Sequence, residues 1–428
     1  MDQNQAIAEL PDDPPPVDSI KEKLGALSSL SLVCCIYKAP KRLRRLNPDA
    51  YTPRVVSIGP LHHGNNEELE AMEDHKLRYL ECLIPKTSLT LEGMVEVAKT
   101  WEADARFCYA EKIKLSSNEF VKMLIVDAGF LVELLLRSPN KVDDSTLDRI
   151  YGKQKMIVDV NHDIMLLENQ LPYFVVEGMF GLLRGDHRGG LPIPQIIHRH
   201  FKKFWMSIPP FPTRTFGLET HHFVALLRSI HLPSVLSFPG GSINRGMMGS
   251  TLSAKEIQNA GVKLNPSDSS TSPLDITFAK GVLTIPQIKI SDITEALYRN
   301  IILFEQCHLL DTYFSDYMMF LSRFVRSPSN AELFIEHGII VNRRGNAKDI
   351  SRLFDRVLKE TTQTSYSAFY YQTVYDKLEV HCNTTWHKSK AILRRDYFHT
   401  HWSAISVGAA VALLILTFIQ ALCSILAL

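Results

Sequence analysis

The sequence lacks the short motifs by which the commonest catalytic sites are recognised. No GxSxG, HExxH, GxxxxGK(S/T) or GxGxxG string occurs, which argues against nucleophile-elbow hydrolases, zinc proteases, P-loop nucleotide hydrolases and dinucleotide-binding enzymes. The seven cysteines form no CxxC pair, and their odd number and irregular spacing argue against a zinc ribbon or a thioredoxin-type redox site. We therefore expect reduced thiols, no catalytic motif residue, no bound metal and no cofactor.

An excess of charge of either sign is also missing. The 428 residues include 47 Lys and Arg against 46 Asp and Glu, which gives a net charge of +1. Such a balance does not favour a protein that coats nucleic acid, so we expect no nucleic-acid partner. The hydrophobic share of 45% and the charged share of 22% are ordinary for globular proteins and exclude a wholly disordered chain.

The N-terminal end has neither a basic residue nor an apolar run in its first twenty residues, which argues against a cleaved secretory signal. Several prolines among acidic residues predict a disordered acidic leader over residues 1–33. The C-terminal end differs, because Trp402–Leu428 contains no charged residue. Ile405–Leu426 is long enough to cross a hydrocarbon core of about 30 Å at about 1.5 Å per residue.

We therefore predict a transmembrane anchor at 402–428 and a single-pass protein of the plasma membrane or an endomembrane. Basic residues precede the span and place the large domain on the cytosolic side, namely Lys388, Lys390, Arg394 and Arg395. The alternative for the apolar run is a buried core helix. Ala404, Gly408 and Ala412 form a small-residue line, and Gln420 is polar, so the anchor could self-associate into a homo- or hetero-oligomer. An ordinary lipid-facing helix is the alternative for this pattern.

Between the two ends, apolar spacing predicts a mainly α, multi-helical soluble domain over residues 34–400 with a small β insertion. Prolines exclude a long helix in 34–60. A loop-rich insertion at about 239–290 carries short strands at Val262–Leu264, Ile276–Phe278 and Val282–Ile290. The domain is one unit or two halves split near 240–275. Helices are expected at Asn66–Ile84, Glu92–Lys114, the run after Ser116, Asp159–Leu183 with a break near Pro172, Ile193–Met206, Leu218–Ile230, Ser291–Leu310, Tyr313–Arg326, Ala331–His337, Ala347–Lys359 and Tyr366–Tyr397.

The polar string Glu168, Asn169 and Gln170 stands just before Pro172 in an otherwise apolar stretch. We interpret it as a structural polar cluster that satisfies backbone groups freed by the proline. Asp163 and Glu168 could also be imagined as an acid and base pair. Five residues apart on a helix, they would not share a face. The paired histidines His62-His63 and His221-His222 are likewise weak candidates as metal ligands, because neighbours on a helix or strand point different ways.

A basic stretch occupies Tyr37–Arg45 and carries five positive charges, at Lys38, Lys41, Arg42, Arg44 and Arg45. In the ordinary interpretation, this stretch is a basic strand exposed to solvent. The functional alternative is contact with an anionic lipid surface or an acidic partner, where each charge contributes about 1 kcal/mol near an anionic membrane. Nucleic-acid binding is less favoured, because the stretch lacks the interleaved aromatic residues of a stacking platform.

Several separated strings together resemble one plant family, the domain of unknown function 247 family (UPF0481-type). The resemblance covers roughly residues 34–426 and rests on blocks in the right order, among them Cys34–Gly64, Glu73–Leu80, Asp163–Phe180 (DIMLLENQLPYFVVEGMF), Phe278–Ile290, Asn300–Gln306, Gly338–Asn342 and Trp402–Ser406. It implies a plant protein, usually with one C-terminal membrane span and with no established enzymatic activity. The best-known members of the family are pollen-side determinants of self-incompatibility in grasses.

The sequence thus favours a membrane-anchored, non-enzymatic protein that acts in recognition or signalling through an unidentified protein partner. A pollen-side self-incompatibility determinant is one form of this function, with specificity placed in the loops Pro239–Ser253 and Asn265–Pro273. The alternative is a hydrolase-like enzyme with an unrecognised active site, for which the candidate residues are His62, His63, Asp163 and Glu168. An enzyme would bring these groups together in one concave pocket.

Overall fold

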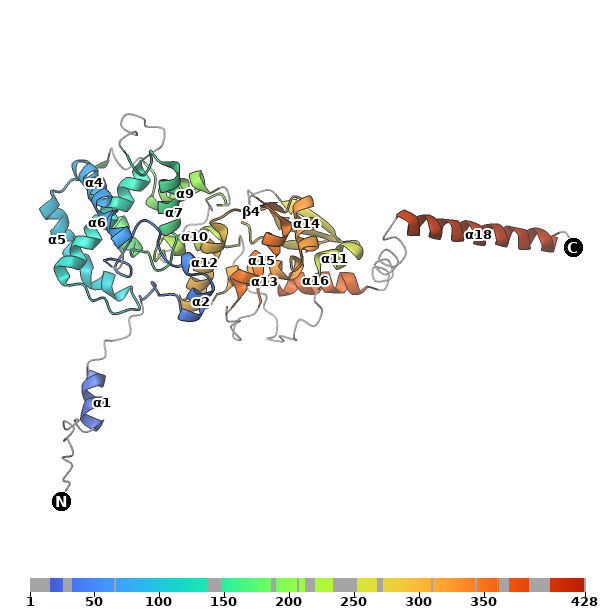
Figure 1. The fold of residues 1–428 in the computed structure, drawn as a ribbon, viewed down its shortest axis with the longest axis horizontal. Coiled ribbons are helices and arrows are strands. Elements are labelled where there is room, and N and C mark those ends of the chain that lie inside the picture. Colours follow the sequence, from blue (N-terminus) through green and yellow to red (C-terminus); the bar gives the residue numbers. More distant parts are fainter. Residues whose placement is uncertain are drawn as a thin grey trace, which may run out of the picture.

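A central helix, α12 (Thr294–His308), joins two lobes of this mainly helical protein (Figure 1). It contacts α10 (Phe223–His231) of the first lobe and both α13 (Tyr313–Phe324) and α15 (Ala347–Leu358) of the second. The computed structural model describes residues 16–25, 33–64, 67–137, 148–185, 190–205, 208–211, 220–233, 252–267, 272–308, 311–342, 345–359, 361, 369–384 and 401–426. Every statement below refers to these residues.

The first lobe is built only from helices and irregular segments. Its elements are α2 (Lys41–Leu46), the 3-10 turn η1 (Pro48–Ala50), α3 (Glu67–Glu70), α4 (Glu73–Leu83), η2 (Ile84–Lys86), α5 (Leu91–Phe107), α6 (Ser117–Leu136), α7 (Gln154–Asp163), α8 (Tyr173–Gly181), α9 (Ile193–Phe204) and α10 (Phe223–His231). Helix α1 (Pro16–Gly25) precedes the lobe and lies within the predicted leader.

Helix α6 is the core helix of the first lobe and contacts α4, α5, α8 and α9. It is apolar on nearly all sides, and residues 120–135 are buried except for the exposed Lys122, which fits a helix enclosed by its neighbours. Its start is fixed by a capping box, in which Ser116 and Glu119 each bond the other's backbone N–H.

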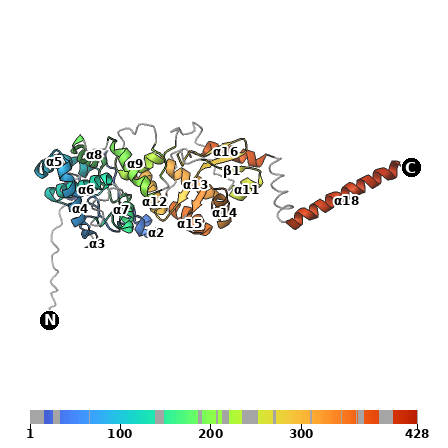
Figure 2. The ribbon, with the colours of Figure 1, turned by 90° about the horizontal axis from the view of Figure 1, so that it is seen from above.

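The second lobe surrounds two small sheets with α11 (Ala254–Asn259), α13 (Tyr313–Phe324), α14 (Pro328–Glu336), α15 (Ala347–Leu358) and α16 (Gln372–Asn383). Figure 2 shows this lobe between the first lobe, which carries α5 and α8, and helix α18 (His401–Leu426). The strands are β1 (Lys263–Ser267), β2 (Thr277–Ala279), β3 (Val282–Pro286), β4 (Ile288–Ile290) and β5 (Ile340–Asn342).

The first sheet has the order β1-β3-β2, with β1 parallel and β2 antiparallel to β3. These strands lie where the sequence predicts the β insertion. The second sheet pairs β4 with β5 in parallel, and Ile288 stands opposite Ile340. Strand β5 was not predicted, because three residues carry little periodicity and the partner strand lies about fifty residues earlier in the chain.

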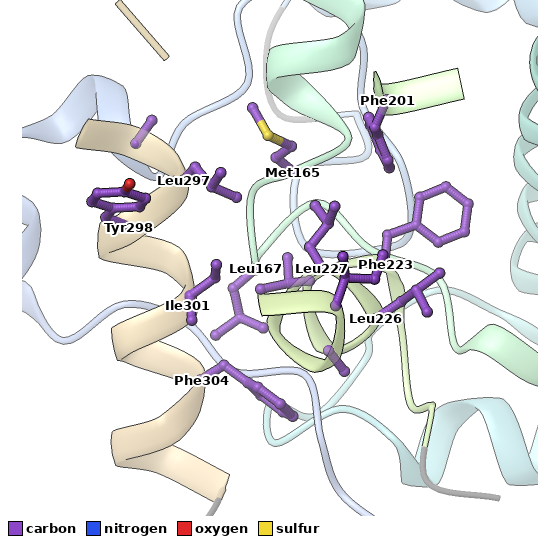
Figure 3. Packing of buried hydrophobic residues seen from close by; sticks show 14 of the residues in the cluster. Met165, Leu167, Phe201, Phe223, Leu226, Leu227, Leu297, Tyr298, Ile301 and Phe304 are labelled. Atoms are coloured by element: carbon purple, nitrogen blue, oxygen red, sulfur yellow. The ribbon is translucent and has the colours of Figure 1, made fainter. Parts of the chain in front are cut away.

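One hydrophobic core runs through both lobes. At the junction, Leu297, Ile301 and Phe304 of α12 face Leu226 and Leu227 of α10 (Figure 3). Figure 3 also shows Met165 and Leu167, from the irregular segment after α7, in the same cluster. Each such side chain contributes about 1.5–3 kcal/mol when it is removed from water. The two lobes are therefore joined by shared apolar packing.

Two helices are shorter at one end than predicted, because residues at that end form other hydrogen bonds. The helix expected at Glu92–Lys114 ends at Phe107, because residues 108–110 pair with Ile36 in an isolated parallel bridge. The helix expected at Leu218–Ile230 begins at Phe223, where the His222 side chain accepts a hydrogen bond from the backbone N–H of Ala225 and caps the helix.

The prediction of a C-terminal transmembrane helix, and with it of a single-pass membrane protein, is wrong. Residues His401–Leu426 do form a helix, α18. Over the described ranges, however, none of the helices combines the length and the apolar character that a membrane crossing demands.

Helix α18 also carries the residues proposed for self-association. Gly408, Ala412 and Gln420 are exposed, and a Cβ added at Gly408 would meet nothing within 4 Å. Ala404 belongs to the helix, but its side chain lies outside the described part. Association through this line of residues stays a prediction.

Candidate functional site

The irregular segment 34–62 is fastened to the first lobe by polar side chains from the chain between α7 and α8. Asp163, the last residue of α7, is fully buried. Its carboxylate accepts hydrogen bonds from the backbone N–H groups of Arg54 (2.9 Å), Val55 (2.7 Å) and Val56 (3.0 Å). One acidic side chain thus satisfies three consecutive donors that belong to no helix or strand.

Glu168 fastens the same segment at a second point. Its Oε1 atom accepts a hydrogen bond from the backbone N–H of Ala39 (2.6 Å) and another from the Arg44 guanidinium. Its Oε2 atom lies 3.3 Å from Nε2 of His62. Only 1% of Glu168 is exposed. The carboxylate is therefore enclosed by a backbone donor, a guanidinium and an imidazole.

Asn169 and Gln170 bond backbone groups on both sides of the break. Asn169 accepts a hydrogen bond from the N–H of Ile58 (2.7 Å) and donates one to the carbonyl of Val56 (2.9 Å). Gln170 donates to the carbonyl of Ile164 (2.8 Å) and accepts from the N–H of Phe223 in the first turn of α10 (3.0 Å). These bonds keep residues 164–172 out of a helix, so the break near Pro172 is longer than the sequence indicated.

Gly59 lies against this cluster in a conformation that only glycine adopts easily. Its φ is +75°, and an added Cβ would lie 2.3 Å from the backbone oxygen of Gln170. Gly59→Ala is expected to lower the free energy of unfolding by about 2 kcal/mol or more, because a left-handed alanine and a backbone clash add together. Chemical denaturation of the full-length chain measures the change.

The matched control is Gly64→Ala. Gly64 has a similar φ of +67°, but an added Cβ there meets nothing within 4 Å. Its expected cost is therefore the conformational part alone, about 1 kcal/mol. Equal costs for the two variants would show that the close approach to Gln170 has no energetic weight.

A buried ion pair joins the same region and was missed at the level of sequence. Lys76 of α4 is completely buried, and its Nζ lies 2.5 Å from Oδ1 of Asp127 in α6 and 2.9 Å from the carbonyl of Ser57. Oδ2 of Asp127 accepts a hydrogen bond from the N–H of Gly59 (2.8 Å). The signal that could have found the pair is Asp127 itself, an acidic residue in the middle of the apolar run of α6.

The four residues of the enzyme alternative do not converge in an open pocket. His62 and Glu168 are neighbours, but Asp163 has His162 beside it, with 3.1 Å between Oδ1 and Nδ1 of the ring. Nδ1 of His63 is buried without a hydrogen-bond partner among the described residues. None of the four lines either of the two cavities described below.

The second histidine pair is divided between two environments. His222 is fully buried, its Nε2 lies 3.2 Å from the carbonyl oxygen of Cys35, and burial lowers its pKa to about 3. His221 lines a cavity and contacts the ring of His308. In the described ranges no group of three or more His, Cys, Asp or Glu side chains is placed to hold a metal ion.

The basic stretch is only partly open to solvent. Arg44 is half-buried and hydrogen-bonds Glu168 and Oγ1 of Thr52 (2.9 Å), so its guanidinium is held inside the first lobe. The other four residues are exposed, on α2 or just before it, namely Lys38, Lys41, Arg42 and Arg45. Contact between these four and an anionic surface stays a prediction.

A cavity of about 800 Å³ lies where α5, α8, the start of α9 and the segment around Cys35 meet. We call it the α5–α8 cavity. Two acidic residues, Asp104 of α5 and Glu177 of α8, line it and are exposed, and Tyr173 lies deeper. Among its described lining residues there is no lysine or arginine. The cavity is therefore acidic.

Two cysteines also line the α5–α8 cavity, at the bridge between segment 34–62 and the end of α5. The backbone N–H of Cys35 donates to the carbonyl of Cys108 (2.9 Å), and the two thiols are hydrogen-bonded. The hydrogen bond between the thiols is the largest cause that raises the pKa of Cys35, and burial is the second. The same bond lowers the pKa of Cys108. All seven cysteines are free thiols.

A second, shallower cavity of about 520 Å³ lies along α9 and has the opposite charge. We call it the α9 cavity. Arg199, Lys202 and Lys203 line it, together with His198 and Phe211. Burial is the main cause that lowers the pKa of Lys203, and the positive charge of Arg199 adds to it. Because α9 also contributes Pro194 to the α5–α8 cavity, one helix borders both sites.

Comparison with known proteins places the chain in a family and goes no further. A UPF0481 protein of Arabidopsis thaliana is 24% identical over 421 residues, which cover 92% of this chain and 86% of the relative. A putative UPF0481 protein of the same plant is 22% identical over 479 residues, with 90% and 89% covered. No solved structure matches the chain. The DUF247 family, described as plant protein of unknown function, matches residues 36–416, and this chain belongs to that family.

Proposed function

We propose that this protein is a non-enzymatic recognition or signalling protein that acts through contact with a protein partner. The observation that carries the proposal is the placement of charge. The acidic side chains of the enzyme alternative are enclosed and already hydrogen-bonded to backbone groups, as Asp163 and Glu168 show. Exposed charged side chains also line two cavities of opposite sign on the first lobe. Complementary charge of this kind guides partner choice.

A pollen-side self-incompatibility determinant would be one form of such a recognition protein. Its specificity was expected in the loops Pro239–Ser253 and Asn265–Pro273. Residues 234–251 and 268–271 lie outside the described part of the chain, so these loops carry no structural argument. The two charged cavities are the surfaces that support the proposal.

The test is quantitative cross-linking of the tagged full-length chain in plant tissue. Proteins cross-linked to the wild type are expected to fall at least fivefold in variants that neutralise a cavity, and to persist in a variant that neutralises an exposed pair on α5. The variants are Asp104→Asn with Glu177→Gln, Lys202→Gln with Lys203→Gln, and the control Glu96→Gln with Lys99→Gln. The same cross-linked proteins in every variant would overturn the proposal. So would hydrolytic turnover by the purified protein that His62→Ala abolishes.

A further inference from the structure

Helices α5 and α8, which both line the α5–α8 cavity, pack closely against each other. A Cβ added to Gly178 of α8 would lie 2.6 Å from Cζ2 of Trp101 in α5, so the indole occupies the space that any side chain at 178 would fill. Asp104 follows Trp101 by three residues, and Glu177 directly precedes Gly178. Neighbours three residues apart share a helix face. The two carboxylates therefore reach the same cavity from two different helices that pack together.

A buried hydroxyl with no partner points to a ligand in this cavity. Tyr173 lines the cavity and is only 7% exposed, yet its Oη atom has no hydrogen-bond partner among the described residues. Buried polar atoms are almost always bonded, so an unpaired one calls for an explanation. Burial is the main cause that raises the pKa of this phenol, and the negative charge of Glu177 adds to it. The hydroxyl therefore stays neutral and can accept a hydrogen bond from a donor that enters the cavity.

We propose that the α5–α8 cavity binds an arginine side chain presented by the partner protein, an inference that rests on the proposed function above. A guanidinium carries five N–H donors and no acceptor. The cavity offers it the carboxylates of Asp104 and Glu177 and the hydroxyl of Tyr173, with no lysine or arginine among the described lining residues. Pro172 and Phe174 supply an apolar wall for the aliphatic stem of the arginine. A volume of about 800 Å³ also leaves room for neighbouring residues of the partner.

The opposite charge preference belongs to the α9 cavity, where three basic residues would repel an arginine and attract a carboxylate or phosphate. Each cavity therefore serves as the control for ligand binding at the other. A cationic probe is expected to respond to changes at Glu177 and to be indifferent to changes at Lys202. A probe that binds by simple adhesion would not make this distinction.

The experiment titrates the full-length chain with acetyl-arginine amide and with its uncharged isostere, acetyl-citrulline amide, by isothermal calorimetry or ligand-observed NMR. Citrulline is expected to bind at least tenfold more weakly, because only the guanidinium forms charge-assisted hydrogen bonds. Asp104→Asn and Glu177→Gln are each expected to weaken arginine binding about tenfold. Glu96→Gln removes an exposed carboxylate of the same helix α5 and is expected to leave binding unchanged.

Tyr173→Phe separates a ligand contact from a structural role. The variant is expected to weaken arginine binding several-fold. Its melting temperature without ligand is expected to equal or exceed that of the wild type, because the hydroxyl has no protein partner to lose. A lower melting temperature together with unchanged arginine binding would show that the hydroxyl serves only the fold.

Equal binding of arginine and citrulline, or an equal loss in Glu96→Gln and Glu177→Gln, would overturn the inference. Its failure is distinguishable from that of the proposed function. If arginine is not preferred but the Asp104→Asn, Glu177→Gln double variant still loses its cross-linked partner, recognition at this cavity stands and only the ligand class is wrong. If the partner is retained as well, both proposals fall.

Discussion

Replacing Lys76 with methionine is expected to lower the free energy of unfolding by about 3–5 kcal/mol, because the carboxylate of Asp127 would remain buried without its counter-charge. Nζ of Lys76 lies 2.5 Å from both Asp127 and Glu73 and bonds the carbonyl of Ser57. Burial works against the charge of Lys76, but the two carboxylates outweigh it and raise the pKa of the ammonium group. Chemical denaturation of the full-length chain, followed by circular dichroism, measures the loss.

Two companion variants make this result interpretable. Lys99→Met removes the exposed partner of Glu96, 2.7 Å away on the surface of α5, and is expected to cost less than about 1 kcal/mol. The double variant Lys76→Met, Asp127→Asn is expected to recover part of the loss, because no charge then stays buried and the amide oxygen can still accept the N–H of Gly59. A cost for Lys76→Met no larger than that for Lys99→Met would contradict the account.

Asp163→Ala is the second variant for which we expect a large effect, a loss of at least about 3 kcal/mol. Its carboxylate is the acceptor for the N–H groups of Arg54, Val55 and Val56, and each donor left unpaired in the interior costs about 1–3 kcal/mol. The loss is again measured by chemical denaturation. Amide hydrogen exchange at Val55 and Val56 is expected to accelerate, since these groups lose their acceptor.

The control for this variant is Asp159→Ala, one helical turn earlier on α7. Asp159 lies 3.4 Å from the half-exposed guanidinium of Arg54 and is expected to contribute less than about 1 kcal/mol. If Asp163→Ala left hydrogen exchange at Val55 unchanged, the segment 34–62 would be held by its apolar contacts alone. In that case the polar residues between α7 and α8 would not be what fastens it.

Local pattern was a good guide wherever a helix buries one face or is enclosed on all sides. The capping box at Ser116 and the apolar run that follows predicted α6, and the alternating residues of 282–290 predicted β3 and β4. The charge of Asp127 inside that run could not be interpreted from sequence, because its partner lies 51 residues earlier on α4. The hydropathy of the C-terminal stretch also led to the prediction of a membrane span. None of the described helices is long and apolar enough to support that prediction.

The sequence by itself determined a mainly helical chain with a small β insertion, an interrupted helix at Pro172 and membership in a plant family, because these depend on short-range periodicity, proline geometry and local residue order. Only the tertiary structure decided which polar groups are enclosed and which are open. Asp104 and Glu177 look like ordinary surface acids in the sequence. They line one cavity because α5 and α8 pack together, with Trp101 against Gly178, and a contact between residues 77 positions apart leaves no trace in local spacing.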